Sequence, residues 1–224
     1  MQENCRWHCF DNDDQVAAAA CLQILDAAER AIAEHGVFKL VLAGGTTPVK
    51  VYRLLAQADA NWAKWVIYYG DERCLPPDHQ HRNSVMASQA LLSKVAIPAA
   101  QIYTMPAETG GESAAAFYQS LVAAALPFDM VLLGMGEDGH VASLFPGHEH
   151  AQNELVHAVH NSPKPPPERV SISADGLSTS HEVIFLITGN KQEAVSRWKQ
   201  GEDLPVARIQ PDNPIDIYCA GITA

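Results

Sequence analysis

Residues 128–140 read FDMVLLGMGEDGH and combine a strand with the turn that follows it. The first six residues are apolar apart from Asp129, which is typical of a strand buried on both faces of a parallel sheet. The seven residues after them include three glycines, Asp138 and His140. Ligands of open α/β sheets bind at the carboxyl ends of the strands. This stretch therefore predicts an α/β fold with a site at the end of a buried strand.

Two more predicted strands end in polar, glycine-containing turns. Residues 38–43 lead into the sequence GGTTP, and residues 65–69 lead into the sequence GDER. The carboxyl ends of parallel strands share one edge of a sheet, so the three turns are expected to meet there.

Helical patterns alternate with strand patterns along the chain. They predict a mainly parallel, Rossmann-like sheet with right-handed crossovers, helices on both faces and a small C-terminal strand extension. We expect one domain over residues 1–224, because no repeat or linker interrupts the pattern. The other predicted strands are residues 101–105, 155–159, 169–173, 182–188, 206–209 and 217–220. The predicted helices are a long one capped by Asp13 or Asp14 and ending near Gly36, one after Pro48, residues 84–93 capped by Asn83, residues 112–125 and residues 191–199.

The charge of the chain limits its partners. The formal net charge is −11, with only 15 Lys and Arg, so a surface for nucleic acid or an acidic membrane is not expected. An anionic small molecule would need a local cluster of cations and backbone N–H groups. No signal-peptide pattern or membrane-length apolar run is present, so we expect a cytoplasmic protein. We also expect a monomer.

The cysteines and histidines do not predict a metal centre. The five cysteines are odd in number and form no C-x-x-C pair, which argues against a disulfide framework or a zinc ribbon. The ten histidines include the pairs His79/His81 and His148/His150, but no zinc-site spacing accompanies them. We expect these pairs at the surface and no metal.

The GGTTP turn is suited to a phosphate. Thr47 is expected to cap the next helix, with Pro48 in its first position. Gly44 and Gly45 let the backbone approach a ligand closely. A helix N-terminus with a hydroxyl beside it, such as that of Thr46, favours an anion. The alternative is a tight strand-to-helix turn that binds nothing.

Three basic residues extend this candidate anion site. Arg73 ends the GDER turn, where a carboxylate next to it can hold its side chain in place, and Arg is the side chain best shaped for two-pronged contact with phosphate. Arg169 follows a loop with four prolines, and Lys191 follows another strand-to-helix turn. The alternative for each is a solvated surface charge.

The turn after the strand at residues 128–133 also matches G-x-G-x-x-G, the pattern of a dinucleotide site. That site requires a full helix next, whereas Pro146 and Gly147 interrupt any helix within two turns. It also requires an acidic residue at the end of the following strand, and residues 155–159 end without one. A catalytic turn that presents Asp138 and His140 is the better interpretation.

Together these segments resemble 6-phosphogluconolactonases, a family of pentose-phosphate-pathway hydrolases with the fold of glucosamine-6-phosphate deaminases and CoA transferases. The resemblance extends over about residues 14–209. In the deaminases, Asp-Gly-His continues in an Ile-Ala-Phe-Asn-Glu-Pro style, whereas residues 141–147 read VASLFPG, as in the lactonases. The matching segments are residues 42–48, 69–73, 133–147, 169–171 and 188–191.

The resemblance implies hydrolysis of 6-phospho-D-glucono-1,5-lactone to 6-phosphogluconate without a cofactor or metal. We expect His140 to be the general base that activates water, and Asp138 to orient it or to stabilise its imidazolium. Backbone N–H groups of the glycine-rich turn are expected to stabilise the oxyanion. The implied substrate-binding residues are Gly44, Gly45, Thr46, Thr47, Asp71, Arg73, Gly136, Arg169 and Lys191.

Some residues depart from the pattern of the lactonases. Val141 stands where they usually carry a hydroxyl residue, and Arg82 adds a charge that is a further candidate for the ligand. The C-terminal segment lacks their usual late Asp and is assigned no function. Two other functions stay open: the isomerase or deaminase chemistry of the related family, and a catalytically silent sensor of sugar phosphates.

Overall fold

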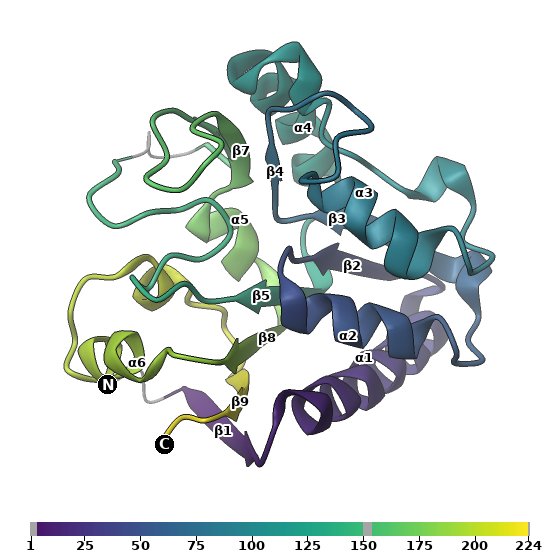
Figure 1. The fold of residues 1–224 in the computed structure, drawn as a ribbon. Coiled ribbons are helices and arrows are strands. Elements are labelled where there is room, and N and C mark those ends of the chain that lie inside the picture. The colour runs from purple at the N-terminus through teal and green to yellow at the C-terminus, as the bar shows by residue number, and fades with distance from the viewer. Residues whose placement is uncertain (1–3, 150–153, 224) are drawn as a thin grey trace.

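The computed structural model describes residues 4–149 and 154–223 and contains two sheets (Figure 1). The strands are β1 (Cys5–Phe10), β2 (Phe38–Leu42), β3 (Trp65–Tyr69), β4 (Asp71–Arg73), β5 (Phe128–Gly134), β6 (Val156–Val159), β7 (Arg169–Ile172), β8 (Ser180–Thr188) and β9 (Ile215–Ala220). Six parallel strands form the larger sheet in the order β1-β9-β8-β5-β2-β3. Three antiparallel strands form the smaller sheet in the order β4-β7-β6.

Helices connect the parallel strands and flank the larger sheet (Figure 1), which confirms the predicted Rossmann-like class. The helices are α1 (Asp13–His35), α2 (Thr46–Leu55), α3 (Asn83–Ala87), α4 (Gly111–Ala125), α5 (Ala174–Ser178) and α6 (Gln192–Lys199). A π-helical turn (Ser88–Leu92) continues α3. Within the described residues, none of the helices combines the length and the apolar character needed to cross a membrane.

The predicted long helix is α1, but its cap differs from the prediction. The side chain of Asn12 accepts hydrogen bonds from the backbone N–H groups of Asp14 and Gln15, at 3.1 and 3.0 Å. Asp13 and Asp14 lie instead in the first turn, where a negative charge complements the helix dipole. Gly36 ends the helix with φ 90°, as an αL cap requires.

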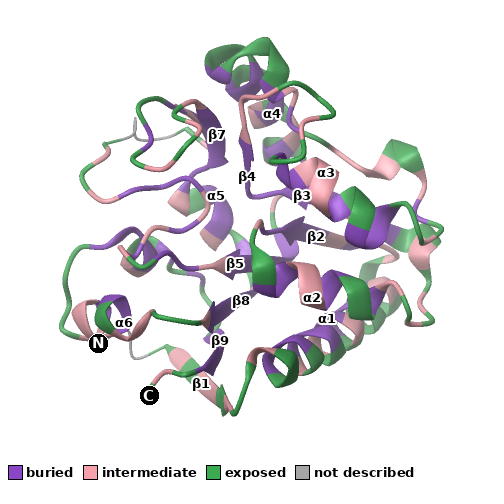
Figure 2. Ribbon diagram, viewed as in Figure 1, coloured by how far each residue is buried: buried purple, intermediate pink, exposed green. Residues whose placement is uncertain are grey.

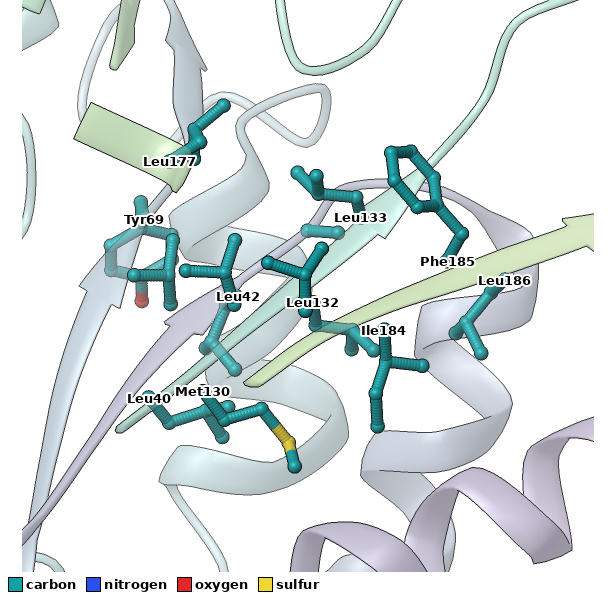
Figure 3. Close-up of a cluster of buried hydrophobic side chains, with 14 of the residues drawn as sticks. Leu40, Leu42, Tyr69, Met130, Leu132, Leu133, Leu177, Ile184, Phe185 and Leu186 are labelled. Carbon is teal, nitrogen blue, oxygen red and sulfur yellow. The ribbon is translucent and has the colours of Figure 1, made fainter. Parts of the chain in front are cut away.

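The central strands of the larger sheet are buried on both faces, as Figure 2 shows. Leu40 of β2, Leu132 of β5 and Ile184 of β8 each have no exposed surface, and they lie in one cluster in Figure 3. Each such side chain stabilises the fold by about 1.5–3 kcal/mol. This burial explains the apolar runs without alternation, and it fixes the positions of the strand ends.

The smaller sheet holds two of the predicted cations beside each other. Strand β4 follows β3 after Gly70 and pairs with β7, so that Arg73 lies opposite Arg169. The backbone N–H of Ile172 donates to the carbonyl of Gly70 at 2.8 Å. This bond ties the smaller sheet to the carboxyl edge of the larger one.

Several segments differ from their predicted structure, among them residues 71–73, which were predicted in a turn and form strand β4, and α5, which was not predicted. Residues 99–101 form a 3₁₀ turn that uses the local carbonyls of Pro98 and Ala99, so the predicted strand at 101–105 is reduced to one bridge between Ile67 and Ile102. The predicted strand at 206–209 is wrong, because residues 205–208 form a 3₁₀ helix. The N–H groups of Ala207 and Ile209 donate to the carbonyls three residues before them, and that of Val206 donates to the carbonyl of Gly139. Strand β1 was not predicted. It lies at the edge of the sheet, where its residues are only partly buried and its sequence mixes polar and apolar residues.

Candidate active site

A cavity of about 380 Å³ opens at the carboxyl ends of β2, β5 and β8. Its wall contains the GGTTP turn, the GDER turn and the glycine-rich turn after β5, which confirms that the three predicted turns meet. Every predicted substrate-binding residue and His140 line this cavity. Asp138 does not line it and contacts His140. The predicted lining residues are Gly44, Gly45, Thr46, Thr47, Asp71, Arg73, Gly136, His140, Arg169 and Lys191.

His140 and Asp138 form a tight pair. The Nδ1 atom of His140 lies 2.5 Å from Oδ1 of Asp138. Burial lowers the pKa of His140 below its ordinary value, and the hydrogen bond with Asp138 opposes part of that shift. Burial works to raise the pKa of Asp138, but the hydrogen bond and charge of His140 outweigh it, so the pKa of Asp138 is lowered. The pair is therefore a carboxylate beside an imidazole that is neutral at pH 7.

Two positions of the turn require glycine, one for its backbone conformation and one for lack of space. Gly139 adopts φ 81°, a conformation that other residues rarely adopt. Gly136 lies next to the pair of His140 and Asp138, and a Cβ atom added there would overlap the imidazole of His140 and come within 2.5 Å of Oδ1 of Asp138. The glycine at position 136 thus leaves room for the pair.

Three N–H groups of this turn are not available to an oxyanion, contrary to our expectation. The N–H of Gly136 donates to the carbonyl of His140 at 2.8 Å, and the N–H of Gly139 donates to the carbonyl of Gly136 at 3.1 Å. The N–H of His140 donates to Oδ1 of Asp138 at 3.3 Å. These bonds close the turn on itself, because a tight turn satisfies its own donors.

Asp71 is buried at the base of the cavity in a network of polar side chains. Ser143 donates its hydroxyl to Oδ2 of Asp71 at 2.6 Å, and the amide of Asn83 donates to Oδ1 at 2.9 Å. Asn83 was predicted only as a helix cap. It is instead the first residue of α3, and its side chain lies so close to Gly44 that a Cβ there would overlap the amide.

Arg73 lines the cavity and has a donor without a partner among the described residues. One Nη atom donates to the carbonyl of His81 at 2.6 Å. The Nε atom is buried and has no hydrogen-bond partner among the described residues. A buried donor without a partner costs about 1–3 kcal/mol, so this guanidinium is suited to an anionic ligand.

Arg82 is not a candidate ligand residue. Its side chain is buried, 3.4 Å from Glu72 and 2.7 Å from Glu108, and it donates to the carbonyl of Met105 at 2.7 Å. The extra charge therefore stabilises the loop before α3 and does not line the main cavity, which corrects the expectation that it faces the ligand.

Arg169 lines the cavity, but most of its donors are used within the protein. It donates to the carbonyls of Lys164, Pro165 and Pro166 at 2.9, 3.1 and 3.1 Å. A fourth hydrogen bond reaches the hydroxyl of Ser143 at 3.3 Å. One of the five N–H groups of the guanidinium remains. Arg169 thus holds the Pro-rich loop against the cavity.

Lys191 and the start of α2 form another part of the wall. The predicted cap at Thr47 is wrong, because the helix begins at Thr46 after Gly45, whose φ of 121° favours glycine. The hydroxyl of Thr47 lies 2.7 Å from that of Thr188. The ammonium of Lys191 lies 3.8 Å from Glu137, too far for a hydrogen bond.

Lys164 also lines the cavity, and it was not predicted. Its side chain is 44% exposed, and its ammonium lies 3.7 Å from Oδ1 of Asp138. Among the residues that the structure describes, no cluster of three or more His, Cys, Asp or Glu side chains could hold a metal ion. His150, one of the paired histidines, lies outside the described residues.

The geometry can be compared with known proteins. The sequence profile described as glucosamine-6-phosphate isomerases/6-phosphogluconolactonase matches residues 11–218. The chain belongs to this family. Relatives within the family include 6-phosphogluconolactonase of Mycobacterium tuberculosis, which is 39% identical over 95% of this chain and 89% of its own length.

Two other similar proteins show how length and fold compare within the family. Probable 6-phosphogluconolactonase 3, chloroplastic, of rice (Oryza sativa subsp. indica) is 36% identical over 80% of this chain, which spans 61% of the rice protein. The crystal structure of 6-phosphogluconolactonase from Thermotoga maritima superposes with a TM-score of 0.89 at 27% identity, covering 96% of this chain and 98% of that one. The same arrangement of sheet and helices therefore occurs in the family.

Proposed function

We propose that the chain hydrolyses 6-phospho-D-glucono-1,5-lactone to 6-phospho-D-gluconate, a step of the oxidative pentose phosphate pathway. The observation that carries the proposal is the pair of His140 and Asp138 at the wall of a cavity that also holds the cations Arg73 and Lys191. A neutral imidazole and two cations in one cavity fit a substrate with a reactive carbonyl and a phosphate. The names of the similar family members support this substrate.

A lactone is an activated ester, so a base-assisted water is sufficient to open it. Nδ1 of His140 is engaged with Asp138, which leaves Nε2 as the basic atom. Water attacks C1 while Nε2 accepts a proton from it, and a tetrahedral oxyanion forms. The bond between C1 and the ring oxygen then breaks, and the imidazolium gives its proton to that oxygen. The product is a carboxylic acid, which loses a proton at neutral pH.

The state of the imidazole suits this role. Burial lowers the pKa of His140 against the opposing effect of Asp138, so the ring is neutral at pH 7 and able to accept a proton. When the ring becomes charged, the carboxylate 2.5 Å away stabilises the imidazolium.

The phosphate binds to Arg73, Lys191 and the first turn of α2 in this proposal. Arg73 has a buried Nε without a partner among the described residues, and the ammonium of Lys191 has its nearest carboxylate at 3.8 Å. The N-terminus of a helix adds backbone donors and a favourable dipole. Arg169 contributes its remaining N–H, and the other binding residues complete the wall of the cavity. These residues are Gly44, Gly45, Thr46, Thr47, Asp71 and Gly136.

The test compares three outcomes on the purified protein. Freshly generated 6-phosphogluconolactone is expected to release acid far faster than without protein, as a pH indicator reports. Ammonia release from glucosamine 6-phosphate would instead support deaminase chemistry. Binding of 6-phosphogluconate without faster opening of the lactone would identify a silent sensor, and either of these two outcomes would overturn the proposal.

A further inference from the structure

Lys164 is the cation that contacts the catalytic pair. Its ammonium lies 3.7 Å from Oδ1 of Asp138, which in turn lies 2.5 Å from Nδ1 of His140. At 3.7 Å the ammonium does not form a hydrogen bond with the carboxylate. Its Nζ donates no hydrogen bond to another described residue, so its three N–H groups can reach a ligand in the cavity that Lys164 lines.

The backbone around Lys164 is held in place. Ser162 donates its hydroxyl to the carbonyl of Lys164 at 2.8 Å, and the N–H of Lys164 donates back to that hydroxyl at 3.2 Å. Arg169 donates to the same carbonyl and to those of the next two residues. The loop is therefore positioned by a buried guanidinium, and the lysine side chain extends from a fixed point.

The transition state needs a positive or hydrogen-bonding group near the oxygen on C1. Three N–H groups of the glycine-rich turn cannot fill this role. Those of Gly136, Gly139 and His140 all bond within the turn. Negative charge develops on the carbonyl oxygen at C1 beside His140. A cation next to the catalytic pair is in a position to stabilise that charge.

We propose that Lys164 stabilises the negative charge at C1, first on the tetrahedral oxyanion and then on the product carboxylate. The proposal rests on the lactonase function proposed above, and it assigns Lys164 to the reacting end of the substrate and not to the phosphate. Arg169 is a positioning residue that acts through the loop. Lys191, at the start of α6, belongs to the phosphate end.

The first test measures turnover of Lys164→Met. Loss of one donor to an oxyanion lowers kcat by about 10²–10³-fold in other enzymes, so we expect a fall of about 10²-fold with a small change in KM. Lys164→Arg keeps the charge and is expected to recover at least a tenth of the lost activity. Since the side chain is 44% exposed, both variants should fold, and their melting temperatures check this.

The second test separates carboxylate binding from phosphate binding. Calorimetry compares 6-phosphogluconate with glucitol 6-phosphate, which carries a hydroxymethyl group in place of the carboxylate. Lys164→Met is expected to lower the affinity for 6-phosphogluconate by tenfold or more. The affinity for glucitol 6-phosphate is expected to stay within twofold of the wild-type value. The matched variant Lys191→Met is expected to lower the affinity for both ligands to a similar degree.

The pH profile gives a third readout. The charge of Lys164 contributes to the low pKa of His140, so its removal should move the acid limb of kcat/KM to higher pH. Equal weakening of the two ligands by Lys164→Met would overturn the proposal and place the lysine at the phosphate. Unchanged kcat and affinities would also overturn it and make Lys164 a solvated charge. A wild-type protein that does not open the lactone would instead refute the proposed function.

Discussion

Replacing Gly136 by alanine tests the geometry of His140 and Asp138, the proposed catalytic pair. The added methyl group would lie within 2.5 Å of Oδ1 of Asp138 and would overlap the ring of His140, whereas ordinary contact begins at 3.4 Å. Both side chains must therefore move by about 1 Å or more. A misplacement of about 1 Å can lower the rate of an enzyme about 10²-fold, which corresponds to about 2.7 kcal/mol in the barrier. We expect kcat/KM of Gly136→Ala to fall by about that factor.

The assay follows acid release from freshly generated lactone, with melting temperature as the measure of folding. Gly134→Ala is the matched control, because its methyl group meets its nearest neighbour, the carbonyl oxygen of Gly44, at 3.9 Å. The control is expected to keep kcat/KM within about threefold of the wild type, since no side chain must move. If Gly136→Ala were as active as the control, the pair would not lie over residue 136 during catalysis.

Other predictions concern binding, pH and stability. Arg73→Ala should lower the affinity for 6-phosphogluconate by about 10–100-fold with little change in kcat, because hydrogen bonds to charged groups contribute about 1.5–3 kcal/mol. A fall in kcat alone would assign Arg73 to the chemical step. The acid limb of kcat/KM should lie below pH 6.5, because burial lowers the pKa of His140 and only the neutral ring accepts a proton. Asp138→Asn should move this limb further down, since it removes the group that raises the pKa; an upward shift would contradict this. Arg82→Ala should cost about 3 kcal/mol in urea unfolding, because it removes the cation beside the buried carboxylate of Glu72, and a loss below about 1 kcal/mol would refute the stabilising role.

The buried part of the fold could be predicted from the sequence because burial leaves a plain pattern. Strands β2, β3 and β5 are apolar runs, and the sheet that they form was predicted together with its site edge. The edge strand β1 has partial exposure and no such pattern. The antiparallel pairing of β4 with β7 joins residues about 100 positions apart, and local sequence contains no signal for it.

The sequence predicted which turns form the cavity, but it did not predict which groups each cation contacts. The position of a cation at a strand end is visible in the sequence, but the direction of its side chain depends on tertiary contacts. Arg82 faces two carboxylates, and Arg169 uses four hydrogen bonds within the protein. Lys164 reaches the cavity because Arg169 holds its loop, so the lysine looks like any loop charge in the sequence.

Turnover of His140→Asn measures the central claim most directly. Asparagine cannot accept the proton of water at neutral pH, so kcat should fall by about 10²–10⁴-fold. The affinity for 6-phosphogluconate, measured by calorimetry, should stay within about threefold, because the phosphate contacts are unchanged. A variant that opens the lactone at close to the wild-type rate would show that His140 is not the base.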